Sequence, residues 1–188
     1  MPHLPVSSSV QDSVTLYTVG HSTRPLIEFL SILQAHDLKT LIDIRAFPAS
    51  RRFPHFSKER LAAALAEHDI SYNWMPSLGG HRSKSLGNSP NIALQSGALR
   101  NYADYMLSPE FERSARELIS IGATSRTAYM CAEKDYRQCH RRLVSDWLAV
   151  HGHDVRHIAD STPPIEHEMT FEARLERDQL IYRGDRLF

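Results

Sequence analysis

Hydrophobic residues along the chain fall into five short runs, separated by segments in which apolar residues recur every three or four positions. Short apolar runs bounded by turn residues are typical of buried β-strands, whereas the wider spacing is typical of helices with one buried face. Serine followed by proline, as at Ser108-Pro109, is typical of a helix start. The pattern predicts strands over 14–19, 40–44, 70–74, 127–131 and 155–158, and helices that begin near Pro25, Ser57, Leu94, Pro109 and Arg141.

Strands that alternate with helices predict a parallel sheet with right-handed crossovers. We therefore expect a three-layer, Rossmann-like α/β fold, in which a mostly parallel five-stranded sheet carries helices on both faces. In the strand order 3-2-1-4-5, the first and fourth strands are neighbours and their carboxyl ends open into one crevice. The expected organisation is a loose arm over 1–12, a single α/β domain over 13–160, and a charged tail over 161–188 that contains one short helix and packs on the domain or on a partner.

Composition narrows the class of protein without identifying a function. Of the 188 residues, 41% are hydrophobic and 23% are charged, and the formal net charge is zero. A neutral chain has no overall field that attracts nucleic acid or an anionic membrane, so any such attraction must come from a local patch. No apolar run approaches the ~18 residues of a membrane helix, and two cysteines cannot build a disulfide framework. We expect a cytoplasmic protein with free thiols and no membrane association.

Candidate chemistry concentrates between Cys131 and Arg141, where both cysteines of the chain lie. This stretch reads as strand, loop and helix, so its polar side chains fall at the carboxyl end of a strand, where open α/β sheets bind ligands. Asp43 lies inside another apolar run, and a buried carboxylate requires a partner, for which Arg45 is the nearest candidate. The residues expected to converge at this edge of the sheet are His21, Ser22, Asp43, Arg45, Cys131, Glu133, Cys139, His140 and Arg141.

Five short motifs occur together in this chain. They are Val19-Gly20-His21-Ser22, Asp43-Ile44-Arg45 with Pro48 and Ser50, Leu78-Gly79-Gly80, Met130-Cys131-Ala132-Glu133, and Cys139-His140-Arg141. In this combination the chain resembles the bacterial domain of unknown function 488 family over roughly residues 16–158. The family is uncharacterised, so the resemblance implies the fold and the position of a site but no reaction.

The thiols allow several interpretations. Cys139, at a helix start beside His140 and Arg141, is expected to have a lowered pKa, which suits a nucleophile or a redox thiol with Cys131 as its resolving partner. The alternative is that both cysteines simply pack in the interior, as buried cysteines commonly do. Metal binding by the cysteines, His140 and His21 is a further possibility, although their spacing is not that of a closed zinc site. We therefore expect no metal to be required for folding.

Two other side chains can move protons, and each has a structural alternative. His21 follows a strand and suits an acid–base or anion-binding role, or else it is a hydrogen-bonded loop residue. Glu133 can serve as a general base if it is buried, or else it forms an ion pair with Arg45 or Arg141.

A basic, aromatic loop over 45–60 completes the candidate site. Arginines interleaved with phenylalanines suit phosphate contact and base stacking, and Arg45, Arg51 and Arg141 are the expected anion ligands. Gly79 and Gly80 start a long segment that is either a lid over the anion or a turn. No Walker or Gly-x-Gly-x-x-Gly motif occurs. We expect an enzyme acting on a phosphate-bearing substrate, either a nucleotide or a nucleic acid; the alternatives are a non-catalytic nucleic-acid-binding module and a metal- or redox-sensing domain.

Overall fold

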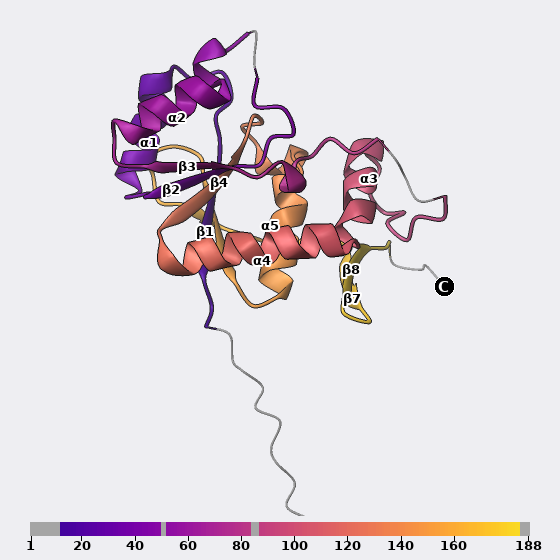
Figure 1. The fold of residues 1–188 in the computed structure, drawn as a ribbon. Coiled ribbons are helices and arrows are strands. Elements are labelled where there is room, and N and C mark those ends of the chain that lie inside the picture. The colour runs from indigo at the N-terminus through magenta and orange to yellow at the C-terminus, as the bar shows by residue number, and fades with distance from the viewer. Residues whose placement is uncertain (1–11, 50–51, 84–86, 185–188) are drawn as a thin grey trace, which may run out of the picture.

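A six-stranded sheet forms the centre of the fold (Figure 1). The computed structural model describes residues 12–49, 52–83 and 87–184. The strand order is β3-β2-β4-β1-β5-β6, in which the first five strands are parallel and β6 is antiparallel. The strands are β1 (Thr15–Gly20), β2 (Thr40–Asp43), β3 (Ser71–Trp74), β4 (Thr127–Cys131), β5 (Asp154–Ile158) and β6 (Ile165–Glu166).

Helices cover both faces of this sheet and produce two separate hydrophobic cores. Successive residues of a strand point to opposite faces, so Leu41 joins the core under α1 and α2, whereas Ile42 joins the core under α3, α4 and α5. The three-layer, Rossmann-like α/β fold predicted from the sequence is confirmed. The helices are α1 (Leu26–Ala35), α2 (Lys58–Ala66), α3 (Gly97–Met106), α4 (Pro109–Thr124) and α5 (Arg141–Val150), with short 3-10 turns η1 (Pro54–Phe56), η2 (Pro76–Leu78) and η3 (Tyr136–Gln138).

The strand order corrects one expectation. The carboxyl ends of β1 and β4 are neighbours, as predicted, and Gly20 pairs with Cys131. However, β2 lies beside β4 and not beside β1, so the order 3-2-1-4-5 is wrong. Pairing of Asp43 with Met130 therefore places the end of β2 directly against the end of β4.

The C-terminal segment also differs from expectation. The short helix predicted within 161–188 is wrong, because the described part of this segment, 161–184, contains only strands. After β6, strands β7 (Ala173–Glu176) and β8 (Gln179–Tyr182) form an antiparallel hairpin. Leu180 and Tyr182 are buried in the core beside α3, α4 and α5. The hairpin thus packs against the body of the domain (Figure 1).

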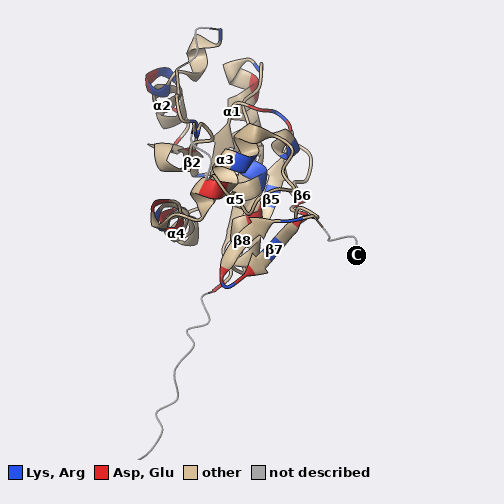
Figure 2. Ribbon diagram, turned by 90° about the vertical axis from the view of Figure 1, so that its right-hand side faces the viewer, with Lys and Arg blue, Asp and Glu red and all other residues tan. Residues whose placement is uncertain are grey.

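Charges of both signs are spread over the helices (Figure 2). Helix α2 begins with Lys58, Glu59 and Arg60, and α4 pairs Glu112 with Arg116 at 2.7 Å. Within 12–49, 52–83 and 87–184, no helix is long and apolar enough to cross a membrane.

Candidate functional site

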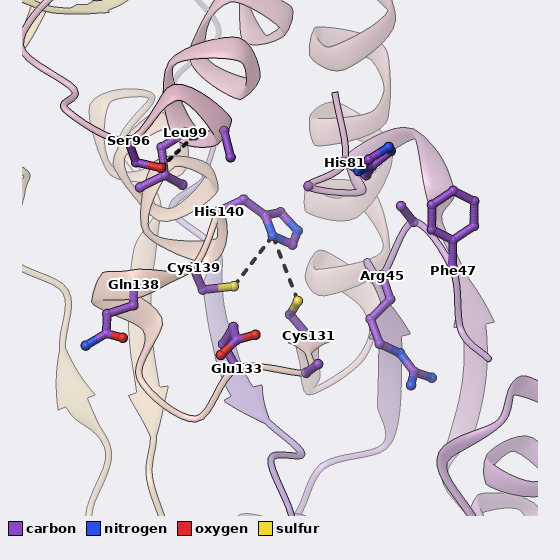
Figure 3. A pocket seen from close by; sticks show the side chains of 14 residues that line it. Arg45, Phe47, His81, Ser96, Leu99, Cys131, Glu133, Gln138, Cys139 and His140 are labelled. Atoms are coloured by element: carbon purple, nitrogen blue, oxygen red, sulfur yellow. Dashed lines mark hydrogen bonds between the residues drawn. The ribbon is translucent and has the colours of Figure 1, made fainter. Parts of the chain in front are cut away.

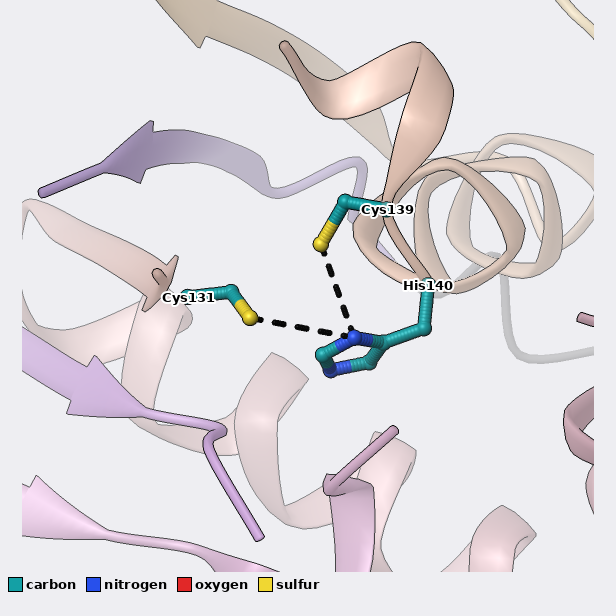
Figure 4. Close-up of side chains that lie close together, drawn as sticks. All are labelled: Cys131, Cys139 and His140. Carbon is teal, nitrogen blue, oxygen red and sulfur yellow. Dashed lines mark hydrogen bonds between the residues drawn. The ribbon is translucent and has the colours of Figure 1, made fainter. Parts of the chain in front are cut away.

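The two cysteines and His140 form a compact buried cluster at the carboxyl edge of the sheet (Figures 3 and 4). The Sγ atoms of Cys131 and Cys139 and the Nδ1 atom of His140 all lie within 4.8 Å of one another. Nδ1 is 3.5 Å from the Cys139 sulfur and 3.9 Å from the Cys131 sulfur. On the other side of the ring, Nε2 lies 3.2 Å from the carbonyl oxygen of Ile44. Because a carbonyl only accepts hydrogen bonds, Nε2 carries a proton, and Nδ1 faces the two sulfurs.

The local sequence explains why these side chains meet. Cys131 is the last residue of β4, and the chain returns through η3, where the Asp135 carboxylate accepts the Arg137 N–H at 2.9 Å. Cys139 lies two residues before the first residue of α5, and its sulfur accepts the backbone N–H of that residue, Arg141, at 3.5 Å. The first N–H groups of a helix have no partner within it, so the sulfur occupies a capping position at the positive end of the helix dipole.

The two thiols hold their protons differently. A hydrogen bond from Cys131 lowers the pKa of Cys139 well below its ordinary value; His140 and Arg141 act in the same direction, and burial opposes them. The hydrogen bond to Cys139, together with burial, raises the pKa of Cys131 well above its ordinary value. The pair therefore favours a thiolate at Cys139 that accepts a hydrogen bond from the protonated Cys131.

Two adjoining cavities open beside this cluster. All three cluster residues line the first cavity, which has a volume of about 500 Å³ (Figure 3). His21 and Ser22 line the second, of about 550 Å³. The two cavities share a wall and together form one cleft, called the cleft below. The shared wall consists of Arg45, Phe47, Ala132, Glu133 and Gln138.

A buried ion pair orients Arg45 toward the cleft. Asp43 is fully buried, and its carboxylate accepts hydrogen bonds from the Arg45 backbone N–H at 3.0 Å, from the Arg45 guanidinium and from the Tyr72 hydroxyl at 2.6 Å. Arg45 is thus the partner that a carboxylate inside a strand requires. Because these donors occupy its oxygens, Asp43 positions the arginine and does not line the cleft itself.

His21 lies in the second cavity with both ring nitrogens engaged. Nδ1 is 2.9 Å from the carbonyl oxygen of Ser22, and Nε2 is 3.3 Å from an Arg45 nitrogen. The ring also stacks on Phe56, with centroids 4.2 Å apart. Burial, reinforced by the Arg45 charge, lowers the pKa of His21 to about 4. A neutral, fully bonded ring matches the alternative of a hydrogen-bonded loop residue better than a positively charged anion ligand.

The family model described as domain of unknown function DUF488 matches residues 25–148. The match covers more than half of the chain and includes the end of β2, β4 and the cysteine–histidine cluster. The chain belongs to the DUF488 family. This confirms the resemblance inferred from the five motifs. Comparison with curated proteins and with solved structures gives no match.

The cleft of this DUF488 protein gathers most of the predicted site residues. Asp43, Gly79 and Arg141 line neither cavity, and Arg51 lies outside the described residues. The predicted residues that line one or both cavities are His21, Ser22, Arg45, Gly80, Cys131, Glu133, Cys139 and His140.

Arg141 holds the loop after β4 in place. Its side chain is 1% exposed and donates to the Thr18 hydroxyl at 3.0 Å and to the backbone carbonyls of Glu133 and Lys134. The guanidinium is therefore directed at protein oxygens and away from the cleft. The Glu133 side chain is exposed, and among the described residues it forms no ion pair with Arg45 or Arg141. Its carboxylate thus lines the cleft without the burial that the general-base alternative required.

Close backbone approach explains two of the motif glycines. A Cβ atom at Gly80 would lie 2.5 Å from Nδ1 of His140, and one at Gly20 would lie 1.9 Å from the carbonyl oxygen of Glu133. Only glycine leaves room for the imidazole at the first position and for the loop after β4 at the second. The segment after Gly80 is fixed where it is described, because the Arg82 guanidinium stacks 3.7 Å from the Tyr105 ring. These contacts match the alternative of a packed turn better than a lid.

A buried chain of hydrogen bonds, not anticipated from the sequence, connects the C-terminal segment to this site. The Asp146 carboxylate accepts from Nε2 of His167 at 2.9 Å, and Nδ1 of His167 lies 2.9 Å from Nε2 of His157. Nδ1 of His157 lies 2.9 Å from the Thr18 hydroxyl, which accepts from Arg141. When both imidazoles are neutral, the carboxylate and guanidinium ends determine the direction of every hydrogen bond between them. In the sequence, the only signal of this chain was an aspartate, Asp146, on the apolar face of α5.

Other cleft residues that the sequence did not single out are Thr23, Ala46, Phe47, Ala49, Arg52, Phe53, His81, Ser96, Ala98, Leu99, Lys134, Asp135 and Gln138.

Proposed function

We propose that this protein is an enzyme that binds a phosphate-bearing substrate, a nucleotide or part of a nucleic acid, in the cleft. One observation carries the proposal: the Cys131–Cys139–His140 cluster and Arg45 line the same cavity. Arginine in a low-dielectric cleft suits an anionic group, and a thiolate beside an imidazole suits covalent, redox or metal chemistry. The substrate's reacting group would then lie against the cluster.

The second cavity supplies groups for the rest of such a substrate. Arg52 is exposed, and its guanidinium lies 5.3 Å from the centroid of the Phe53 ring. Phe47 is 71% exposed and lines both cavities. An exposed aromatic ring beside an arginine that forms no ion pair within the described part of the chain suits base stacking combined with phosphate contact. Volumes of about 500 and 550 Å³ fall within the range of about 300–1,000 Å³ typical of small-molecule sites.

Binding of defined ligands tests this proposal. The full chain is titrated calorimetrically with inorganic phosphate, a nucleoside monophosphate and a short single-stranded oligonucleotide at low salt. Arg52→Ala should weaken binding about tenfold, the effect of one charged hydrogen bond worth about 1.5 kcal/mol. Arg116→Ala is the matched control, because Arg116 lies on α4, pairs with Glu112 and lines neither cavity of the cleft. Absence of binding to all three ligands would refute the proposal.

The exposed Phe47 also supports a second candidate, a nucleic-acid-binding module without catalysis. This candidate predicts tight, salt-dependent binding of the oligonucleotide alone, because the phosphates of a strand release counterions when arginines contact them. The enzyme hypothesis predicts that the bound nucleotide is converted to a product. It also predicts that Cys139→Ser abolishes this conversion while binding persists. Binding without conversion, unchanged by Cys139→Ser, would favour the module.

A further inference from the structure

The cysteine–histidine cluster has the composition and the geometry of a metal site. Two sulfurs and one imidazole nitrogen, all within 4.8 Å of one another, point toward a common centre (Figure 4). We propose that Cys131, Cys139 and His140 bind a divalent zinc ion through Sγ, Sγ and Nδ1. Thiolate and imidazole are the ligands that zinc prefers, and two thiolates neutralise the charge of the ion in a buried site.

The surroundings of the imidazole prepare it for this role. The Ile44 carbonyl accepts the proton of Nε2 at 3.2 Å, so the lone pair of Nδ1 is directed at the two sulfurs. Histidines that ligate metals characteristically donate their other ring N–H to a carbonyl or carboxylate in this way. Gly80 keeps the space beside Nδ1 open, because a Cβ atom there would lie 2.5 Å from that nitrogen. Two independent features therefore orient the ring and leave it accessible.

The surroundings of the sulfurs support negative charge. The Arg141 backbone N–H donates to the Cys139 sulfur at 3.5 Å, and the start of α5 adds the positive end of its dipole. At helix starts, backbone N–H groups characteristically donate hydrogen bonds to negatively charged acceptors. Zinc binds cysteine as the thiolate, so each thiol that ligates the ion would release its proton to solvent.

The open side of the site indicates a catalytic and not a closed structural role. All three proposed ligands line the cavity of about 500 Å³. Among the described residues, the cluster contains no fourth histidine, cysteine or carboxylate. A zinc ion with three protein ligands keeps its fourth position for water or substrate, whereas structural sites are closed by four. This inference rests on the proposed function, because it names the cofactor that would act on a substrate in the cleft.

Metal titration of the full chain tests the site without any substrate. The reduced protein is stripped with a chelator and titrated with Co²⁺, and sulfur-to-cobalt charge transfer and visible ligand-field bands are recorded. One ion per chain should bind with thiolate and tetrahedral bands, and Zn²⁺ should displace it stoichiometrically. Cys139→Ser and His140→Asn should weaken the affinity by more than the 10–100-fold typical of outer-shell changes. His68→Asn is the control, because His68 lies beside Gln34 after α2, lines neither cavity of the cleft and should leave affinity unchanged.

A measurement on the unmodified chain covers the case in which the ligand variants do not fold. X-ray absorption of the zinc-loaded protein should show two sulfur neighbours at about 2.3 Å and nitrogen at about 2.0 Å. A shell of nitrogen and oxygen alone, or cobalt binding without thiolate bands, would overturn the site. Metal binding without affinity for phosphate-bearing ligands would uphold the site and refute the proposed function. If the chain binds phosphate-bearing ligands but takes up no metal, the proposed function is upheld and the metal site is refuted.

Discussion

The free energy of unfolding should fall steeply as the solution is acidified, because His157 is held neutral in the folded chain. Its ring is 4% exposed and stacks on Tyr136, with centroids 3.3 Å apart. It lies between the Thr18 hydroxyl and His167, each 2.9 Å from one of its nitrogens. Burial first, and then the nearby His167, Arg141 and Arg137 charges, lower its pKa to about 2. An added proton would create a buried cation near the positive charges of Arg141 and Arg137.

The direction of this pH dependence follows from comparing proton binding by the folded and the unfolded chain. An unfolded histidine has an ordinary pKa of about 6.5, so below this pH the unfolded chain binds a proton that the folded chain refuses. The contribution of His157 is complete above pH ~6.5 and is lost as the pH falls from there toward the folded pKa of about 2. The slope is about 1.4 kcal/mol per pH unit, which amounts to about 2 kcal/mol by pH ~5. His21, whose pKa is lowered to about 4, loses a comparable amount over the same interval.

Urea unfolding at pH ~7, ~6 and ~5 measures this loss. His157→Gln should lose about 2 kcal/mol less than the unmodified chain between the first and last pH. Any cost of the substitution at neutral pH cancels, because only the change with pH is compared. His81→Gln, at an exposed position, should follow the unmodified chain. Equal losses in His157→Gln and the unmodified chain would refute a neutral, buried His157.

Two further substitutions test the packing around the cleft. Gly80→Ala places a Cβ atom 2.5 Å from Nδ1 of His140 and should lower zinc affinity about 10–100-fold in a chelator competition, whereas Gly87→Ala, which meets no atom within 4 Å, should not. Asp43→Asn leaves the buried guanidinium beside it without its counter-charge and should lower the free energy of unfolding by about 3–5 kcal/mol in urea. Asp154→Asn, in the more exposed pair with an arginine, should cost less than about 1 kcal/mol, and equal costs would contradict the buried ion pair.

Local patterns predicted the elements of this fold well. The apolar run before Gly20 and the run ending at Cys131 are buried on both sides, so their composition alone indicates parallel strands under helices. Ser108 caps α4 through the Phe111 N–H at 3.3 Å, as the serine–proline start predicted. Such signals depend on neighbours in sequence and therefore need no knowledge of the tertiary structure.

Strand order and the C-terminal hairpin could not be predicted in the same way. Interior strands of a parallel sheet are buried on both faces, so nothing in β2 distinguishes β4 from β1 as its partner. The hairpin turn uses Arg177 and Asp178, both with positive φ, where glycine or asparagine is the usual signal. Its apolar residues Leu180 and Tyr182 are few, and the charged residues around them resemble a solvated tail.

The candidate site was predictable at the level of residues but not of contacts. Cysteine, histidine and arginine at the end of β4 indicated chemistry, and the structure brings Cys131, Cys139 and His140 together. Their spacing argued against a metal because it does not match the common closed zinc motifs. Common zinc motifs place paired cysteines with about two to four residues between them, whereas Cys131 and Cys139 are further apart and meet because the connection through η3 returns the chain from the end of β4 to the start of α5.

The unexpected strand order is what completes the cluster. Because β2 lies beside β4, the Ile44 N–H bonds to the Met130 carbonyl at 3.0 Å, and the Ile44 carbonyl reaches Nε2 of His140 at 3.2 Å. With β1 between them, as in the order 3-2-1-4-5, Ile44 would lie a further ~4.8 Å away, the distance between neighbouring strands. Nε2 would then lack an acceptor, and nothing would direct the Nδ1 lone pair at Cys131 and Cys139. The pairing of β2 with β4 therefore orients the imidazole on which both the thiolate chemistry and the proposed metal site depend.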